Sequence, residues 1–424
     1  MRAIVERLER AGHEAWCVGG AVRDALLGLY HLDWDIATAA RPDYVRRLFK
    51  RTIPVGIEFG TVGVLDERGV LHEVTTFRRD VRTDGRHAEV EFGVSLEEDL
   101  ARRDFTINAM AFSPSLGELR DPFGGQADLE RRVVRAVGDA RARMREDRLR
   151  ALRAIRFASR FGFEIEPATW SAIVESAPYL GRLSAERVKQ EIEKTLEQVR
   201  APSGAFRKWR ESGAFGVLVP PLSGISDDEL AVVDALPMTS LPERRPARRV
   251  LRIAALFLGV SGGEVRAALR ALRFSNTDVN AVTRIVDGWV AIGPDIERAL
   301  VSQGAGVTDA QLRRWIAALG RTEWTLVMRI ASAVWSAARD RGARVPSEPV
   351  IRAVYRRGVR IAYRDPVAVG DLAVDGDDLQ AAGIGRGPAI GRILTRLIET
   401  VVEDPRKNQR DVLLALAREL AEGT

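Results

Sequence analysis

The hydrophobic and polar residues of the chain follow two different patterns. Between about residues 15 and 120, short alternating apolar runs are separated by Gly, Pro and Asp, as in "AWCVGG", "WDIATAA", "TVGVLD", "LHEVTTF", "AEVEFGV" and "TINAMAFSP". Alternation of this kind is typical of strands with one buried face. From about residue 139 the apolar residues recur every three or four positions instead, as in "RLRALRAIRFASRF". The pattern predicts an α+β fold: a head with a mixed sheet and a few helices, followed by a long helical remainder.

Local composition suggests how the helical remainder divides. The Pro- and Arg-rich stretches at 236–249 and 341–350 are typical of linkers between helices. We therefore expect a catalytic head at 1–138, a helical neck at 139–200, a helical body at 201–340 and a helical tail at 341–424. No repeat of fixed period is visible.

Composition narrows the class of protein only slightly. The 65 Lys and Arg residues, most of them Arg, exceed the 59 Asp and Glu residues by six, which permits an anionic partner without requiring one. The single cysteine excludes an internal disulfide, and the four scattered histidines lack metal-ligand spacing. No apolar stretch approaches the length of a membrane span or a secretion signal, so we expect a cytoplasmic protein. The sequence indicates no oligomeric state.

Two neighbouring glycines mark the first candidate site. In "WCVGGAVRD" a predicted strand meets Gly19 and Gly20 and continues as a helix that carries Arg23 on its first turn. Glycines let a ligand approach the backbone, and the first turn of a helix offers N–H groups to a phosphate. A plain strand–turn–helix explains the same residues, so this motif alone does not decide.

Acidic residues follow on the next predicted strand. In "LDWDIAT", Asp33 and Asp35 project to one face of the strand, while Trp34 and Ile36 point into the core. Adjacent carboxylates repel unless divalent ions neutralise them. Glu73 in "LHEVTTF" is the candidate third carboxylate, with Val74 as its core neighbour. Solvated carboxylates at an exposed strand end are the alternative.

Arginines and a further carboxylate complete the candidate chemistry. Arg103, in "EEDLARRDFTINAM", is placed at the end of an acidic helix and before a strand, where it could clamp a triphosphate or pair with a nearby carboxylate. In "MREDRLRALRAIRF", Asp147, Arg150, Arg153 and Arg156 recur every three residues, which forms one ridge on a helix. Such arginines repel unless carboxylates or a polyanion face them. An Asp and an Arg side by side also present the acceptor and donor edges that a nucleobase needs, although a solvent-facing salt-bridge ladder fits the spacing too.

Six of these motifs, in this order, resemble one known family. "VGGAVRD", "DWDIAT", "HEVTTFR", "RRDFTIN", "RDPFGGQADL" and "REDRLRALRAIRF" are similar to the motif series of the class II tRNA nucleotidyltransferases and bacterial poly(A) polymerases, within the DNA polymerase beta-like superfamily. The resemblance covers about residues 15–165, and the helical remainder fits that family's neck, body and tail.

The resemblance implies a role for each matching residue. Asp33 and Asp35 match the pair that binds two Mg²⁺ ions, and Glu73 matches a third catalytic carboxylate. The residues that match nucleotide-binding positions are Gly19, Gly20, Arg23, Arg103, Glu146, Asp147, Arg150, Arg153 and Arg156. Asp84, Gly85 and Arg86 match a flexible loop used in switching between nucleotides. Gly385 and Arg386 lie in a glycine-rich stretch of the tail. This stretch could bind a tRNA phosphate or form a simple turn between helices.

The reaction that the resemblance implies is template-independent addition or repair of the 3′-terminal CCA of tRNA from CTP and ATP, by a two-metal mechanism. The expected partners are therefore tRNA and nucleoside triphosphates. The stretch "PVGIEFGTVGVL" and the length of the loop near Asp84 favour the full CCA-adding enzymes. Enzymes that add only A or only CC, poly(A) polymerases, and a catalytically inactive RNA-binding module remain as alternatives.

Overall fold

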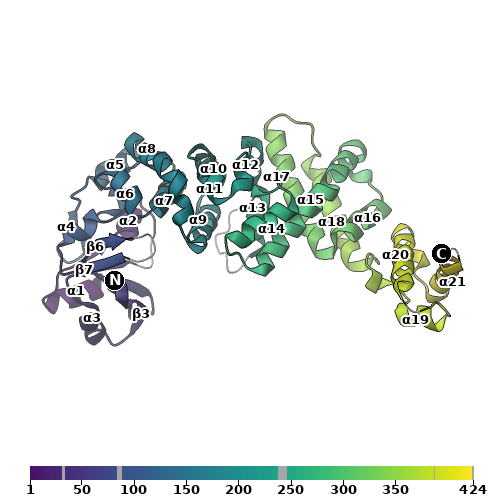
Figure 1. Ribbon diagram of the computed structural model, residues 1–424, viewed down its shortest axis with the longest axis horizontal. Coiled ribbons are helices and arrows are strands. Elements are labelled where there is room, and N and C mark those ends of the chain that lie inside the picture. The colour runs from purple at the N-terminus through teal and green to yellow at the C-terminus, as the bar shows by residue number, and fades with distance from the viewer. Residues whose placement is uncertain (31–33, 84–87, 237–245, 386, 423–424) are drawn as a thin grey trace. The chain divides into compact units, whose positions relative to one another are not determined.

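The chain folds into two compact units. The computed structural model describes residues 1–30, 34–83, 88–236, 246–385 and 387–422. Packing divides the chain into Met1–Gly224 and Ile225–Thr424. All strands among the described residues lie in the first unit, whereas the second is helical, as the ribbon in Figure 1 shows. The predicted α+β head with a helical remainder is confirmed, while the finer division into head, neck, body and tail stays a prediction.

A seven-stranded sheet forms the centre of the head. Its strands lie in the order β3-β4-β5-β2-β1-β8-β9, and only β2 and β5 pair in parallel. Their bounds are β1 Ala15–Val18, β2 Asp35–Thr38, β3 Thr52–Gly56, β4 Thr61–Leu65, β5 Leu71–Thr76, β8 Ala111–Ser113 and β9 Glu118–Arg120. Two smaller sheets pair β6 Arg78–Thr83 with β7 Ala88–Phe92, and β10 Val133–Val134 with β11 Glu164–Ile165.

One predicted strand is much shorter than its sequence suggests. The run "TINAMAFSP" forms a 3-10 turn, η2 (Thr106–Asn108), and only Ala111–Ser113 joins the sheet. The buried Thr106 hydroxyl donates to Asp128 and the buried Asn108 amide donates to Asp104. These side-chain bonds favour a local turn over an extended strand.

Helices surround the sheet and then continue the first unit. They are α1 Arg2–Arg10, α2 Gly20–Leu26, α3 Pro42–Leu48, α4 Leu96–Ala101, α5 Gly125–Arg131, α6 Ala140–Glu146, α7 Leu149–Phe161, α8 Pro167–Ser176, α9 Ala185–Gln198, α10 Pro202–Glu211 and α11 Ala214–Leu218. Short 3-10 turns lie at η1 Ile57–Phe59, η3 Ala177–Arg182 and η4 Pro220–Leu222.

Strand β1 is buried on both faces and anchors the head. Trp16 and Val18 pack with Leu100 of α4 on one face. Cys17 lies on the opposite face and is fully buried, and burial raises the pKa of its thiol to about 12. Both ends of β1 are thereby fixed, and so is the turn that follows Val18.

The second unit consists of packed helices. They are α12 Asp227–Asp234, α13 Pro246–Leu256, α14 Gly262–Ala271, α15 Asn276–Gln303, α16 Asp309–Leu319, α17 Arg321–Asp340, α18 Glu348–Arg364, α19 Gly376–Ala381, α20 Pro388–Glu403 and α21 Arg410–Glu422, with 3-10 turns at η6 Gly304–Gly306, η7 Val369–Asp371 and η8 Pro405–Lys407. The segment 341–347 joins α17 to α18, as its composition predicts, whereas most of the predicted linker 236–249 lies outside the described residues.

A buried arginine joins the last helices to the rest of this unit. Arg313 of α16 donates from Nε to the Val402 carbonyl (2.6 Å) and from Nη1 to the Asp365 carboxylate (3.0 Å). It therefore satisfies a carbonyl at the C-terminal end of α20, where helix carbonyls lack internal partners.

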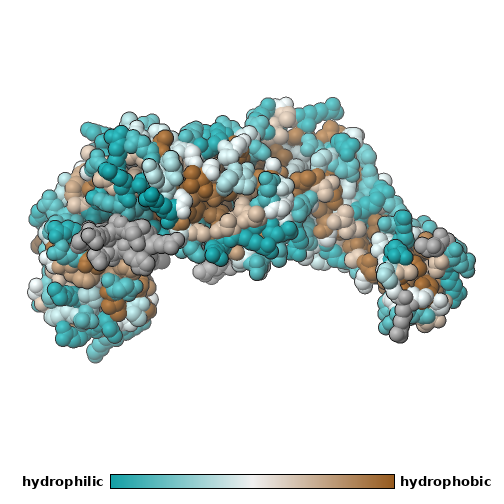
Figure 2. Space-filling view, viewed as in Figure 1, coloured by the Kyte–Doolittle hydropathy of each residue, from teal (hydrophilic) through white to brown (hydrophobic). Residues whose placement is uncertain are grey.

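The surface is largely polar. Figure 2 shows hydrophilic residues spread along the visible face of both units. Among the described residues, none of the helices combines the length and the apolar character that crossing a membrane requires.

Candidate functional site

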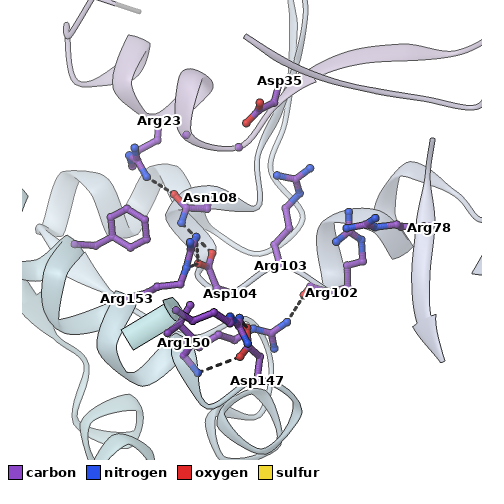
Figure 3. Close-up of a pocket in the computed structure, with 15 residues that line it drawn as sticks. Arg23, Asp35, Arg78, Arg102, Arg103, Asp104, Asn108, Asp147, Arg150 and Arg153 are labelled. Atoms are coloured by element: carbon purple, nitrogen blue, oxygen red, sulfur yellow. Dashed lines mark hydrogen bonds and ion pairs between the residues drawn. The ribbon is translucent and has the colours of Figure 1, made fainter. Parts of the chain in front are cut away.

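A polar cavity of about 560 Å³ lies in the first unit. Its lining comes from the turn after β1, the start of β2, the segment between α4 and η2, and the residues around α7 and α9. Figure 3 shows these side chains converging from separate parts of the chain. The lining residues are Gly19, Gly20, Arg23, Asp35, Arg78, Arg102, Arg103, Asp104, Asn108, Asp147, Leu149, Arg150, Arg153, Phe157 and Arg187.

Gly19 makes the turn into this cavity possible. Its φ is +75°, in the left-handed region that favours glycine. A Cβ atom there would lie 2.8 Å from Nη1 of Arg103 and 3.6 Å from Oδ2 of Asp35. The missing side chain thus lets a guanidinium and a carboxylate approach the same turn, and Gly20 begins α2 beside it.

Asp35 and Glu73 lie on adjacent parallel strands. Strands β2 and β5 pair Ile36 with Val74, and these two side chains are buried. Asp35 and Glu73 each precede one member of that pair, and both are exposed. Adjacent strands are about 4.8 Å apart, so the two carboxylates lie near each other on one face of the sheet. Asp33 lies outside the described residues.

Arg23 is buried instead of reaching openly into the cavity. It is 3 % exposed, donates to Asp24 and Asn108, and packs against Phe157 and Phe161 at 5.1 and 4.7 Å from their ring centroids. Burial lowers the pKa of Arg23, although Asp24 partly offsets this effect. Its guanidinium therefore forms part of the cavity wall and holds Asn108 in place.

Asp99 positions two of the cavity arginines. Oδ1 of Asp99 accepts from Arg102 at 2.7 Å, and Oδ2 accepts from Arg103 at 3.2 Å. Burial alone would raise the pKa of this carboxyl, but Arg103 and Arg102 outweigh burial and hold the pKa below its usual value. The Nε of Arg103 is buried and has no hydrogen-bond partner among the described residues. Asp99 takes Nη2 of Arg103, whereas Nη1 lies at the glycine turn of the cavity, where a ligand could meet it.

Asp147 and Arg150 lie on the side of the cavity opposite Asp35, as Figure 3 shows. Asp147 directly follows α6, and its carboxylate accepts from Arg187 (2.7 Å) and from the N–H of Leu149, the first residue of α7 (3.0 Å). Arg150 donates to the carboxylate of Glu146 at 2.7 Å and also to main-chain carbonyls. Both side chains are therefore fixed before any ligand arrives.

The predicted ridge of arginines faces protein carboxylates. Arg153 donates to Asp104 at 2.8 Å, and Arg156 donates to Glu191 of α9 at 2.7 Å. Arg156 is 3 % exposed and does not line the cavity, so the ridge is not continuous there. Its expected contact with a nucleotide, and that of Glu146, stay predictions.

Comparison with known proteins identifies the family of this chain. A model of the poly A polymerase head domain matches residues 15–135, and a model of a probable RNA and SrmB-binding site of polymerase A matches residues 162–225. A CCA-adding enzyme of Limosilactobacillus fermentum is 35% identical over 430 residues, covering 99% of this chain and 96% of the relative. This chain belongs to the family of CCA-adding enzymes. The resemblance that the sequence motifs indicate is confirmed.

Further similarities to the CCA-adding enzymes also extend over nearly the whole chain. The one of Geobacillus kaustophilus is 36% identical over 417 residues, covering 97% of this chain and 94% of the relative. Among solved structures, the Bacillus stearothermophilus CCA-adding enzyme in complex with CTP is 34% identical and aligns with a TM-score of 0.75, covering 99% of this chain and 96% of that one. The fold of the CCA-adding enzymes therefore extends over both units.

Several cavity residues of this family member do not stand out in its sequence. Arg78 starts β6 and donates to the Phe59 carbonyl, while Arg187 comes from α9, far from the catalytic motifs in sequence. Asn108 lies within "RRDFTIN", but its type alone suggests no contact with Arg23. Only packing of α9 against α7 brings Arg187 to Asp147.

Two predicted regions lie partly outside the described residues. Asp84, Gly85 and Arg86 follow β6, and nothing in the structure describes them. Gly385 lines a cavity of about 890 Å³ in the second unit together with Arg392 and Arg396, whereas Arg386 is not described. The proposed roles of both regions stay predictions.

Replacing Asp99 with asparagine should remove an acid-sensitive part of the stability of this CCA-adding family member. The lowered pKa of Asp99 means that its contribution is present above the ordinary carboxyl pKa and is lost as the pH falls through the lower folded-state value. We expect Asp99→Asn to cost about 3 kcal/mol near neutral pH, and the difference from wild type to narrow below about pH 4.

Urea unfolding at a series of pH values measures this difference. Asp43→Asn is the matched control, because Asp43 is exposed on α3 and does not line the cavity. A difference between wild type and Asp99→Asn that stays constant from neutral to acid pH would contradict the prediction.

Proposed function

We propose that this protein builds or repairs the 3′-terminal CCA of tRNA from CTP and ATP, using the cavity of the first unit for the incoming nucleotide. The observation that carries the proposal is that one cavity joins the glycine turn, Asp35 and Arg103 with the Asp147–Arg150 pair. An arginine suits a triphosphate, a strand-end carboxylate suits the metal ion that accompanies it, and the second pair suits a base. A solved relative at 34% identity is described as a complex with CTP, which supports the same substrate class.

The carboxylates of β2 and β5 suit magnesium ions. Asp35 and Glu73 are oxygen donors on neighbouring strands, and Asp33 precedes Asp35 by two residues in the chain. Mg²⁺ prefers carboxylate and water oxygens, so these residues fit it. When bound, two such ions would activate the 3′-hydroxyl of the tRNA and neutralise the leaving pyrophosphate.

The chain's own residues would hold the nucleotide from both ends. The N–H groups at the start of α2 and the guanidinium of Arg103 would bind the triphosphate. At the other end, the Asp147 carboxylate offers an acceptor and the Arg150 guanidinium offers donors. Because Arg187 and Glu146 fix these two groups, only a base with a complementary edge would complete the contacts.

A single assay tests the activity. The protein is incubated with tRNA lacking CCA, and with tRNA ending in CC, in the presence of Mg²⁺ and of CTP, ATP or both. We expect CMP to be added first, followed by one AMP. AMP addition only to tRNA ending in CC would indicate an A-adding enzyme, CMP addition without AMP a CC-adding enzyme, and long A tails a poly(A) polymerase. Binding of tRNA without any addition would identify an inactive RNA-binding module.

We also infer a cytoplasmic location. A chain whose one cysteine is buried in β1 depends on no disulfide and suits a reducing compartment.

A further inference from the structure

His72 lies buried behind the proposed metal site. It is the second residue of β5 and is 1 % exposed, on the face of the sheet opposite to Glu73. Its ring nitrogens both have partners. Nδ1 accepts a hydrogen bond from the N–H of Trp34 at 3.1 Å, and Nε2 lies 3.4 Å from Oδ2 of Asp66. A buried imidazole with two directed partners connects parts of the chain that the sheet ladder does not join.

Trp34 lies directly before β2 and its first residue, Asp35. Trp34 stands between Asp33 and Asp35 in the chain. The pairing of β2 with β5 begins only at Ile36 and Val74, so the N–H of Trp34 lies before the first pair of that ladder. Its hydrogen bond goes to a side chain instead.

We propose that His72 is a positioning residue, which fixes the Trp34 peptide directly before Asp35 through its Nδ1 atom. An imidazole nitrogen accepts a hydrogen bond only when it carries no proton, so the ring proton is on Nε2, facing Asp66. Rotation about the Trp34 backbone would turn the following Asp35 carboxylate away from the proposed metal site. His72 opposes this rotation without touching nucleotide or metal. The inference rests on the proposed function, since it requires a metal to be held by Asp35.

Asp66 fixes the other end of this connection. It lies in the turn between β4 and β5, where its Oδ1 accepts from the N–H groups of Arg68 (2.9 Å) and Val70 (2.8 Å). The bond from Val70 contributes most to holding the pKa of Asp66 below its usual value. A turn held in this way presents Oδ2 as a fixed acceptor for the Nε2 proton of His72. The turn, the imidazole and the Trp34 peptide therefore form one continuous chain of hydrogen-bonded groups that ends directly before Asp35.

Paired substitutions separate positioning from simple packing. His72→Asn places an amide oxygen at the same number of bonds from Cα as Nδ1, so it can still accept from Trp34. His72→Gln places its polar atoms at the distance of Nε2, so it keeps a partner for Asp66 but not for Trp34. His72→Phe removes both bonds and keeps a buried ring. The probes are Mn²⁺ alone, followed by its electron paramagnetic resonance signal, and the Mg²⁺ concentration that half-saturates CMP addition.

We expect His72→Gln and His72→Phe to weaken Mn²⁺ binding about tenfold or more, with a parallel rise in the Mg²⁺ requirement, because residues that orient metal ligands contribute 10–100-fold to affinity. His72→Asn should stay within about threefold of wild type, even where its melting temperature falls as far as that of His72→Gln. In ¹⁵N-histidine spectra of the full chain, the resonance that His72→Asn removes should be that of a ring protonated on Nε2. Equal Mn²⁺ affinities for the Asn and Gln variants, or a ring protonated on Nδ1, would overturn the proposal.

The Asp35→Ala variant distinguishes failure of the proposed role of His72 from failure of the proposed function. Unchanged Mn²⁺ binding in Asp35→Ala would remove the proposed metal site itself. Loss of binding in Asp35→Ala together with wild-type binding in His72→Phe would leave the metal site intact and overturn only the role of His72.

Discussion

Alanine at position 35 should abolish most nucleotide addition while leaving tRNA binding intact. Asp35 lies at the start of β2, beside the glycine turn and in register with Glu73, so its carboxylate is the described group best placed to hold a metal at the triphosphate. A bound metal ion contributes several kcal/mol to the stabilisation of charge in the transition state. We therefore expect the rate of CMP addition to fall about a thousandfold or more in Asp35→Ala, and further in the double variant with Asp33→Ala.

Single-turnover addition of CMP to tRNA lacking CCA measures this loss. Asp43→Ala is the control, because it removes an exposed carboxylate of the same head outside the cavity. Gel-shift titration with tRNA should give the same affinity for wild type and both variants. Asp35→Ala that retained more than about a tenth of the wild-type rate would refute the metal assignment.

Replacing Asp147 with asparagine should weaken the preference for one nucleotide base over another. The Asp147 carboxylate is held by Arg187 and by the Leu149 N–H, so it presents a fixed acceptor to the cavity. A hydrogen bond to a charged group contributes about 1.5–3 kcal/mol. The asparagine substitution removes the charge and replaces one carboxylate oxygen, an acceptor, with an amide nitrogen, a donor. We expect the preference of kcat/KM for CTP over UTP to fall about ten- to a hundredfold in Asp147→Asn, with a similar effect in Arg150→Ala.

Values of kcat/KM for all four nucleoside triphosphates test this expectation. Arg145→Ala is the matched control for Arg150→Ala, because Arg145 is exposed on α6 and does not line the cavity. Equal losses for the four nucleotides would mean that Asp147 supports the cavity without reading the base.

Local motifs made most of the site predictable. Gly19 follows a strand, Asp35 starts one and Arg103 follows a short helix, so a short stretch of sequence places each of them. The alternation predicted buried side chains at Trp34, Ile36 and Val74, which the structure confirms for Ile36 and Val74, whereas Trp34 is only partly buried. Grouping Asp35 with Glu73 as carboxylates of one site was possible from the sequence, because the hydrophobic pattern of each strand determines which of its residues face away from the core.

The partners of the site residues could not be predicted in the same way. The ridge spacing predicted a common direction for Arg153 and Arg156, yet Glu191 of α9 draws Arg156 into a buried pair. The contact between Arg187 and Asp147 likewise depends on how α9 packs on α7. These pairings join residues about 35–40 positions apart, and no local periodicity encodes them.

Several arginines of the cavity already have a carboxylate partner. Arg102 and Arg103 share Asp99, Arg150 has Glu146, and Arg153 has Asp104. A triphosphate entering such a cavity meets arginines whose charge is partly neutralised instead of a bare positive cluster. Attraction is thereby moderated, and the pyrophosphate product leaves a site whose positive charge is already partly balanced. For an enzyme that must release product after every nucleotide it adds to the same tRNA, this balance favours turnover over tight retention.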